Sequence, residues 1–180
     1  FNEHALGAFL AWEWDGDPRV HYHGYAMDAQ FYDRDYQGVN KSPQEFQRVV
    51  DTYDIGAFLL QRIPVSPTSG PLFHRLLLTL PEWRLVFWDQ RVMVFLRDRP
   101  DHREILERNE YRYLDPFRPS RVDRGIRENP GRLYEEALRA LDADPTNPMA
   151  RKVLAKLYHQ NPDELLRKRQ GGAANGASLR

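Results

Sequence analysis

Two histidines and three aspartates gather in a short segment near the start of the chain. His21 and His23 are two positions apart, and in a strand that spacing directs both imidazoles to the same face. Such histidine pairs occur in zinc sites, and nearby carboxylates could complete a divalent metal site; they are Asp28, Asp33 and Asp35. No third ligand has a fixed spacing, so a solvent-facing strand edge and a solvated helix face are the stronger interpretation. We expect no metal and no cofactor.

Nucleophilic chemistry has little support in the sequence. Ser66, Ser69 and His74 are close together, but no Gly-x-Ser-x-Gly elbow is present. The chain has no cysteine and no glycine-rich phosphate loop, which removes thiol nucleophiles, thiolate metal sites and disulfides. Glu13 and Asp15 lie where a helix gives way to a turn, and turn chemistry explains them. We therefore assign no catalytic residue.

Charge and hydropathy exclude further classes. The chain holds 26 Lys and Arg against 26 Asp and Glu. This balance combines an acidic first half with a basic second half, whose excess is too dilute for a nucleic-acid surface. No run approaches the roughly 20 apolar residues of a membrane-spanning helix. Most aromatic residues lie in the first half, so we expect the larger core there.

The strongest structural signal is residues 83–98. Two apolar runs, 85–88 and 92–96, flank the polar triplet Asp89-Gln90-Arg91, a pattern typical of a β-hairpin. Both runs are nearly continuous, which favours a sheet covered by helices on both faces. Ser42-Pro43, with Glu45 following, predicts the start of a helix whose buried stripe is Phe46, Val49, Val50 and Tyr53.

The remaining patterns predict an α/β fold. We expect further helices at 5–14, 27–39 and 71–80, and further strands at 19–23 and 55–61. Together they form a small α/β sandwich, with a mixed sheet of about four strands flanked by helices. We expect four regions: an α/β domain at 1–98, a linker at 99–129, a helical hairpin at 130–170 and a disordered tail at 171–180.

The predicted hairpin resembles the seam of a tetratricopeptide repeat. Ala140 to Asn147 would form the end of one helix and an Asp-Pro turn, and residues 154–158 would belong to the next helix. Ala140 and Ala155 would allow the helices to cross closely. Arg151 stands where the repeat normally has Trp. The predicted partner-binding residues of this hairpin are Arg151, Leu154, Leu157 and Tyr158.

A second resemblance covers roughly residues 1–97. The matching positions are Asn2, Gly7, Phe9-Leu10, Trp12, Pro18, Val20, Gly24, Tyr32, Tyr53-Asp54-Ile55 and residues 83–89. This pattern resembles the C-terminal soluble domain of bacterial polytopic membrane proteins that are themselves similar to dolichyl-phosphate-mannose-type glycosyltransferases. Two departures are Ala8 in place of a second glycine, and His23-Gly24-Tyr25 where the family has Asp-Gly-Arg.

The resemblance implies an extracytoplasmic, periplasmic accessory domain that follows the last membrane span. Its expected partners are a transmembrane region upstream of Phe1 and a glycan or a polyprenyl-phosphate-linked sugar. The catalytic carboxylates of such a protein would lie outside this chain. The ligand-binding candidates are Asn2, His21, His23, Tyr25, Asp28 and Tyr32. The alternative is a protein–protein interaction module, with an α/β domain and a repeat-like tail that docks a protein partner.

Overall fold

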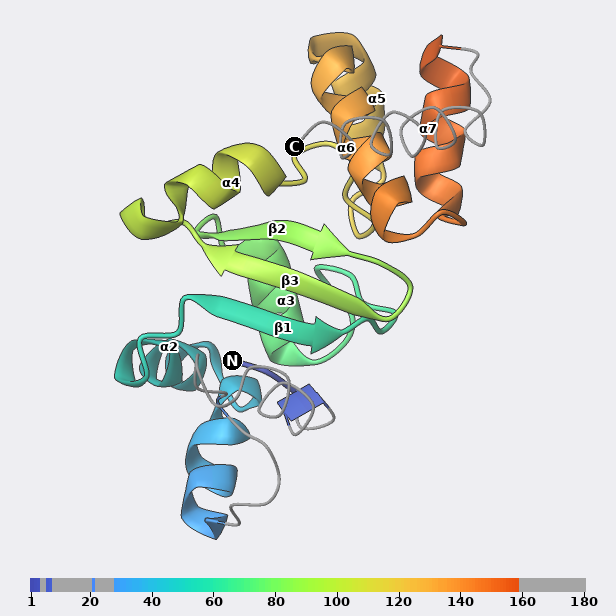
Figure 1. Cartoon of the computed structure of the whole chain (residues 1–180). Coiled ribbons are helices and arrows are strands. Elements are labelled where there is room, and N and C mark those ends of the chain that lie inside the picture. Colours follow the sequence, from blue (N-terminus) through green and yellow to red (C-terminus); the bar gives the residue numbers. More distant parts are fainter. Residues whose placement is uncertain (4–5, 8–20, 22–27, 159–180) are drawn as a thin grey trace, which may run out of the picture. The chain divides into compact units, whose positions relative to one another are not determined.

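The computed structural model describes residues 1–3, 6–7, 21 and 28–158 (Figure 1). The chain divides into two compact units, Phe1–Glu110 and Tyr111–Arg180. We describe each by itself. The predicted strand at 19–23, apart from His21, lies outside the described residues, as do the predicted helix at 5–14, apart from Leu6 and Gly7, and the tail.

The first unit is built on a three-stranded antiparallel sheet with the strand order β1-β3-β2. Its strands are β1 (Ala57–Gln61), β2 (Trp83–Trp88) and β3 (Val92–Arg97). Asn2 adds an isolated parallel bridge to Leu59 at the free edge of β1. Of the predicted four-stranded mixed sheet, the described residues therefore form three antiparallel strands and this one parallel contact.

The β-hairpin predicted at residues 83–98 is confirmed. Asp89 Oδ1 accepts hydrogen bonds from the backbone N–H groups of Arg91 at 2.6 Å and Val92 at 2.7 Å. These bonds hold the turn between β2 and β3. On β2, Trp83, Leu85 and Trp88 are buried while the intervening residues are half-buried. One face of the strand is thus fully buried and the other only partly, in contrast to the equal burial that the continuous apolar runs indicated.

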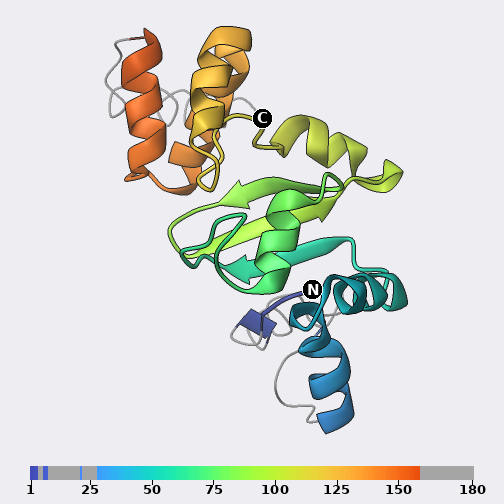
Figure 2. The same ribbon diagram turned by 180° about the vertical axis from the view of Figure 1, so that it is seen from behind.

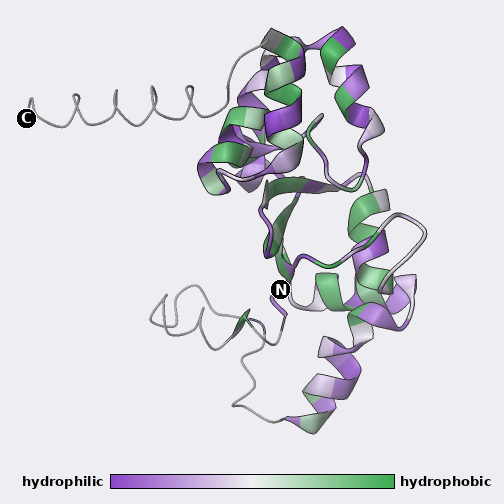
Figure 3. Ribbon diagram, turned by 90° about the vertical axis from the view of Figure 1, so that its right-hand side faces the viewer, coloured by the Kyte–Doolittle hydropathy of each residue, from purple (hydrophilic) through white to green (hydrophobic). Residues whose placement is uncertain are grey.

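Two helices, α2 (Pro43–Thr52) and α3 (Leu72–Thr79), pack on the buried side of this sheet. The short helix η2 (Gly38–Asn40) contacts both of them, and η1 (Phe31–Tyr36) contacts η2. Figure 2 shows α3 lying across one face of the sheet, and hydrophilic residues predominate on η1 in Figure 3. Phe58 packs edge-on against Trp83 at 4.9 Å and stacks on Phe46 at 5.7 Å. Aromatic residues from α2, β1 and β2 therefore share one core.

The helix start at Ser42 is confirmed. Its hydroxyl accepts the Glu45 backbone N–H at 3.1 Å, with Pro43 at the first helical position. Phe46, Val49 and Val50 are buried as expected. Tyr53 is not: its side chain is 39% exposed at the end of the helix. Its ring leaves the apolar stripe because its hydroxyl bonds the Asp35 carboxylate.

The segment predicted to be a linker, 99–129, contains ordered helices. Two of them, η3 (Pro100–His102) and α4 (Arg103–Asn109), belong to the first unit. The Asp98 backbone N–H bonds the Glu82 carbonyl at 2.6 Å, and Leu106 is buried. These contacts anchor a charged stretch whose composition alone is typical of a connector.

The described part of the second unit contains α5 (Ser120–Glu128), α6 (Pro130–Ala143) and α7 (Pro148–Tyr158), and α6 contacts both of the others. Leu133, Ala140 and Leu154 are fully buried. The turn from α6 to α7 is fixed by Asp144, which accepts from Thr146, and by Asn147, which accepts the Ala150 N–H at 3.1 Å. Ala155 is exposed, and Ala150 is the small residue that is buried instead. The resemblance to a tetratricopeptide repeat stays a prediction.

Candidate functional site

A cleft of about 670 Å³ opens in the first unit where α2 ends and β1 begins. It brings together residues that are far apart in the sequence. Its described lining is Phe1, His21, Phe31, Tyr53, Asp54, Ile55, Gly56, Ala57, Arg99 and His102. The lining combines aromatic faces with imidazole, guanidinium and carboxylate groups, which is the usual composition of a ligand site.

One wall of the cleft is aromatic. The His21 ring lies 4.8 Å from Phe1, 5.2 Å from Phe31 and 5.1 Å from Tyr53, measured between ring centroids. Phe31 and Tyr53 meet edge to face at 5.8 Å. Such edge-to-face pairs are favourable and hold the rings in defined orientations. The wall is therefore built from four separate segments of the chain.

His21 is uncharged at neutral pH. Burial lowers the pKa of its imidazole to about 4, because the aromatic surroundings disfavour the charged form. Its backbone N–H donates to Asn2 Oδ1 at 2.9 Å. Its Nε2 atom is buried and makes no hydrogen bond within the protein. A buried polar atom without a partner is unusual in a protein interior.

The opposite side of the cleft is polar. Arg99 donates to both oxygens of Asp101, at 2.7 and 2.8 Å, and to Asp54 Oδ1 at 2.9 Å. Asp54 has a φ angle of 45°, in the left-handed region that Asp and Asn tolerate better than most residues. The bond to Arg99 holds the Asp54 carboxylate at the cleft in this conformation.

His102 reaches the cleft across a glycine. Its Nδ1 atom lies 2.9 Å from the Arg97 carbonyl, which can only accept, so Nδ1 donates. A Cβ at Gly56 would lie 2.8 Å from His102 Cε1 and 3.3 Å from Arg99 Nη1. Position 56 therefore has to be glycine for the imidazole to take this place.

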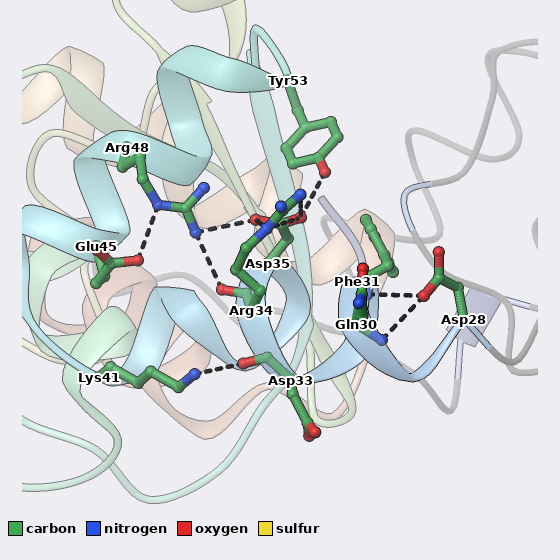
Figure 4. Close-up of polar contacts among 10 residues, drawn as sticks. All are labelled: Asp28, Gln30, Phe31, Asp33, Arg34, Asp35, Lys41, Glu45, Arg48 and Tyr53. Atoms are coloured by element: carbon green, nitrogen blue, oxygen red, sulfur yellow. Dashed lines mark hydrogen bonds and ion pairs between the residues drawn. The ribbon is translucent and has the colours of Figure 1, made fainter.

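A buried carboxylate behind the aromatic wall positions Tyr53 (Figure 4). The Tyr53 hydroxyl donates to Asp35 Oδ2 at 2.7 Å. Asp35 also accepts from Arg34 at 2.7 Å and pairs with Arg48 at 2.9 Å. The Arg34 guanidinium holds the pKa of the Asp35 carboxyl well below its usual range. Burial and the bond to Asp35 raise the pKa of Tyr53, so its hydroxyl remains protonated.

The structure brings together only some of the predicted ligand-binding residues. Asn2 is buried and bonds His21, which lines the cleft. Asp28 is instead a helix-capping residue, because its Oδ1 accepts from the backbone of Gln30 at 2.9 Å and of Phe31 at 3.1 Å. Tyr32 is 38% exposed and stacks on Tyr36 at 5.5 Å, away from the described cleft lining. His23 and Tyr25 lie outside the described residues.

Of the described cleft lining, only His21 was predicted as a ligand-binding residue. The missed residues with polar groups are Tyr53, Asp54, Arg99 and His102. Tyr53-Asp54 appeared in the resemblance, and Tyr53 was also predicted to belong to the buried stripe of the helix. Arg99 and His102 fell within the predicted linker. A usable signal was Asp54 followed by Gly56 directly after a helix, because this pair permits the close approach of another segment.

The predicted partner surface of the second unit needs one correction. Leu154 is fully buried in the helical core, so its side chain is not available to a partner. Leu157 is half-exposed, and Arg151 donates to the Pro145 carbonyl at 3.1 Å. A groove of about 370 Å³ lies beside α7; its lining residues include Val122, Met149, Val153 and Lys156.

Two searches of the described residues, and comparisons with known proteins, gave no match. Within the described ranges, no three or more His, Asp or Glu side chains are placed to hold a metal ion. Among those same residues, no helix has both the length and the apolar character needed to cross a membrane. The chain matches no family model, no curated protein and no solved structure.

Proposed function

We propose that this chain is the extracytoplasmic accessory region of a membrane glycosyltransferase-like protein, and that its first unit binds a sugar in the cleft without performing the transfer itself. The observation that carries the proposal is a convergence of residues. Asn2 and Tyr53-Asp54-Ile55 belong to the pattern that resembles that family. Asn2 holds His21 at the cleft, and Tyr53, Asp54 and Ile55 line it.

The lining supports a sugar as the ligand on chemical grounds. Sugar rings present apolar C–H faces and a rim of hydroxyl groups. The exposed ring of Tyr53 and the half-buried ring of Phe31 offer apolar surface. Asp54, Arg99 and His102 offer hydrogen-bonding groups across from them. One wall would thus receive the ring, and the other would fix the hydroxyls.

The binding claim is tested by a matched pair of substitutions. Tyr53 and Tyr32 are almost equally exposed, at 39% and 38%, but only Tyr53 lines the cleft. Tyr53→Ala should weaken binding of a hexose oligosaccharide about tenfold, because it removes the stacking surface, while Tyr32→Ala should leave it unchanged. Binding is measured by isothermal titration calorimetry, with circular dichroism to confirm folding. Equal effects of the two substitutions would contradict the assignment.

The cellular claim needs a separate experiment. Cells expressing the complete gene product are fractionated, and the reading frame upstream of Phe1 is inspected for hydrophobic spans. We expect the product in the membrane fraction, with several spans before Phe1. A product recovered in the soluble fraction, with no such spans encoded, would contradict the accessory-domain proposal.

The groove of the second unit favours one alternative, a protein-interaction module. Its lining includes the apolar residues Val122, Met149 and Val153, and also Lys156, which pairs with Asp123 at 3.2 Å. On this proposal Met149→Asp would abolish capture of a partner protein and leave sugar binding intact. If Met149→Asp retained both partner capture and sugar binding, that result would count against the groove as a docking site.

A further inference from the structure

We infer that the cleft takes an uncharged saccharide unit and discriminates against a phosphate-linked sugar. This inference rests on the proposed sugar-binding function and names the chemical class of its ligand. In the setting of a transferase, it assigns the cleft to a neutral acceptor glycan and not to the phosphate end of a lipid-linked donor.

The first step of the argument is charge. Arg99 is the one Lys or Arg side chain among the lining residues that the structure describes. It is already neutralised, because Asp101 takes two of its N–H groups and Asp54 takes a third. Two carboxylates against one guanidinium leave a surplus negative charge at this edge. A phosphate placed here would meet that charge, and among the described lining residues the guanidinium of Arg99, the one Lys or Arg side chain, is already paired.

The second step is hydrogen-bond polarity. Asp54 Oδ1 accepts from Arg99, and the second oxygen of the same carboxylate is a further acceptor at the cleft. It can accept a proton from a sugar hydroxyl. A phosphate group at neutral pH offers mostly acceptors, so it does not satisfy this oxygen.

The third step is the neutral imidazole of His21. Its ring lies 4.8 Å from Phe1 and 5.2 Å from Phe31, and burial among these groups disfavours its charged form. The ring therefore supplies no positive charge to a phosphate, whereas a neutral sugar needs none.

The test uses matched ligands that differ only in the phosphate. The 180-residue chain is titrated with glucose, mannose, galactose and N-acetylglucosamine, and with the corresponding 1-phosphates, followed by NMR chemical shifts. We expect at least one neutral sugar to bind about fivefold or more tightly than its phosphate at low salt. Added sodium chloride should narrow that difference, because screening reduces the repulsion.

A substitution isolates the surplus carboxylate. Asp54→Asn removes one negative charge and keeps a side chain that tolerates a positive φ, so the backbone is preserved. We expect it to reduce the preference for the neutral sugar to about twofold or less. Asp51→Asn is the matched control, since Asp51 is an exposed carboxylate on α2 outside the cleft lining; it should leave the preference unchanged.

The outcomes separate the two claims. A 1-phosphate that binds more tightly than its neutral sugar, with affinity that falls as salt rises, overturns this inference and leaves the sugar-binding proposal standing. An unchanged preference in Asp54→Asn also overturns it. If no sugar of either series shifts the cleft resonances, the proposed sugar-binding function fails and this inference fails with it.

Discussion

The buried Asp35 carboxylate is the group whose removal should most disturb the cleft. Its side chain has no solvent exposure and contacts Arg34, Arg48 and Tyr53. In Asp35→Asn the amide keeps one acceptor oxygen but directs N–H groups toward donors. Removing one partner of a fully buried ion pair costs about 3–5 kcal/mol. Here Arg34 is 68% exposed and Arg48 35% exposed, so both can return to water. We therefore predict a loss at the lower end, about 3 kcal/mol of unfolding free energy.

The same substitution should be coupled to Tyr53. Tyr53→Phe removes the hydroxyl bonded to Asp35 and should cost about 1.5 kcal/mol, as expected for a hydrogen bond to a charged group. In the double variant the two losses should not add, because they share one bond. The predicted coupling energy is about 1 kcal/mol.

The assay is urea unfolding followed by tryptophan fluorescence. All four Trp residues of the chain lie within the first unit, so the signal reports that unit alone. Asp33→Asn is the matched control: Asp33 is an exposed carboxylate on the same helix and should change stability by no more than about 0.5 kcal/mol. If Asp35→Asn cost no more than this control, or if the Asp35 and Tyr53 losses simply added, the reasoning would be refuted.

Three more predictions concern other parts of the structure. Gly56→Ala should destabilise the first unit by about 1–3 kcal/mol and weaken sugar binding, because the added Cβ would displace His102. Both effects are measured by calorimetry. Gly131→Ala is the control and should be neutral or stabilising, because a Cβ at this position would contact only Asn129, at 3.8 Å. Burial lowers the pKa of His74 to about 4, so the unfolded chain binds the proton first as pH falls. His74 should therefore lower the unfolding free energy by up to about 3 kcal/mol between pH 6.5 and 4, in addition to the loss from His21, whose pKa burial also lowers to about 4. In pH-dependent urea unfolding, His74→Leu should remove the contribution of His74 and reduce the slope, and an unchanged slope would contradict this. Glu136 accepts hydrogen bonds from the backbone N–H groups of residues 112–114. Glu136→Gln should therefore destabilise the second unit by about 2–3 kcal/mol, measured by far-ultraviolet circular dichroism, and leave the tryptophan fluorescence transition unchanged. A shift in the fluorescence transition would show that the effect is not confined to the second unit.

Local patterns predicted much of the secondary structure. The Asp89-Gln90-Arg91 turn between apolar runs, and Ser42 followed by Pro43, each determine a geometry through nearby hydrogen bonds. Sequence periodicity can detect such features because every group involved lies within a few residues. The number and order of the strands could be predicted less well from the sequence, because they depend on pairings between distant segments.

The cleft was largely hidden from the sequence for the same reason. His21, Tyr53 and Arg99 are brought together only by long-range contacts, such as the bond from His21 to Asn2 and that from Arg99 to Asp54. Asp28 illustrates the opposite error, because a carboxylate near histidines can equally cap a helix. Tyr53 followed the apolar spacing of α2, but its hydroxyl partner Asp35 lies on another helix.

The central claim is that the cleft between Tyr53 and His102 binds a saccharide, and NMR of the ¹⁵N-labelled chain tests it most directly. A neutral hexose oligosaccharide is titrated in, and the backbone amide shifts are mapped. We predict saturable shifts concentrated at Asp54 to Ala57 and at Arg99 and His102, and their loss in Tyr53→Ala but not in Tyr32→Ala. Saturable shifts confined to other residues, or none up to the highest sugar concentration, would contradict the account.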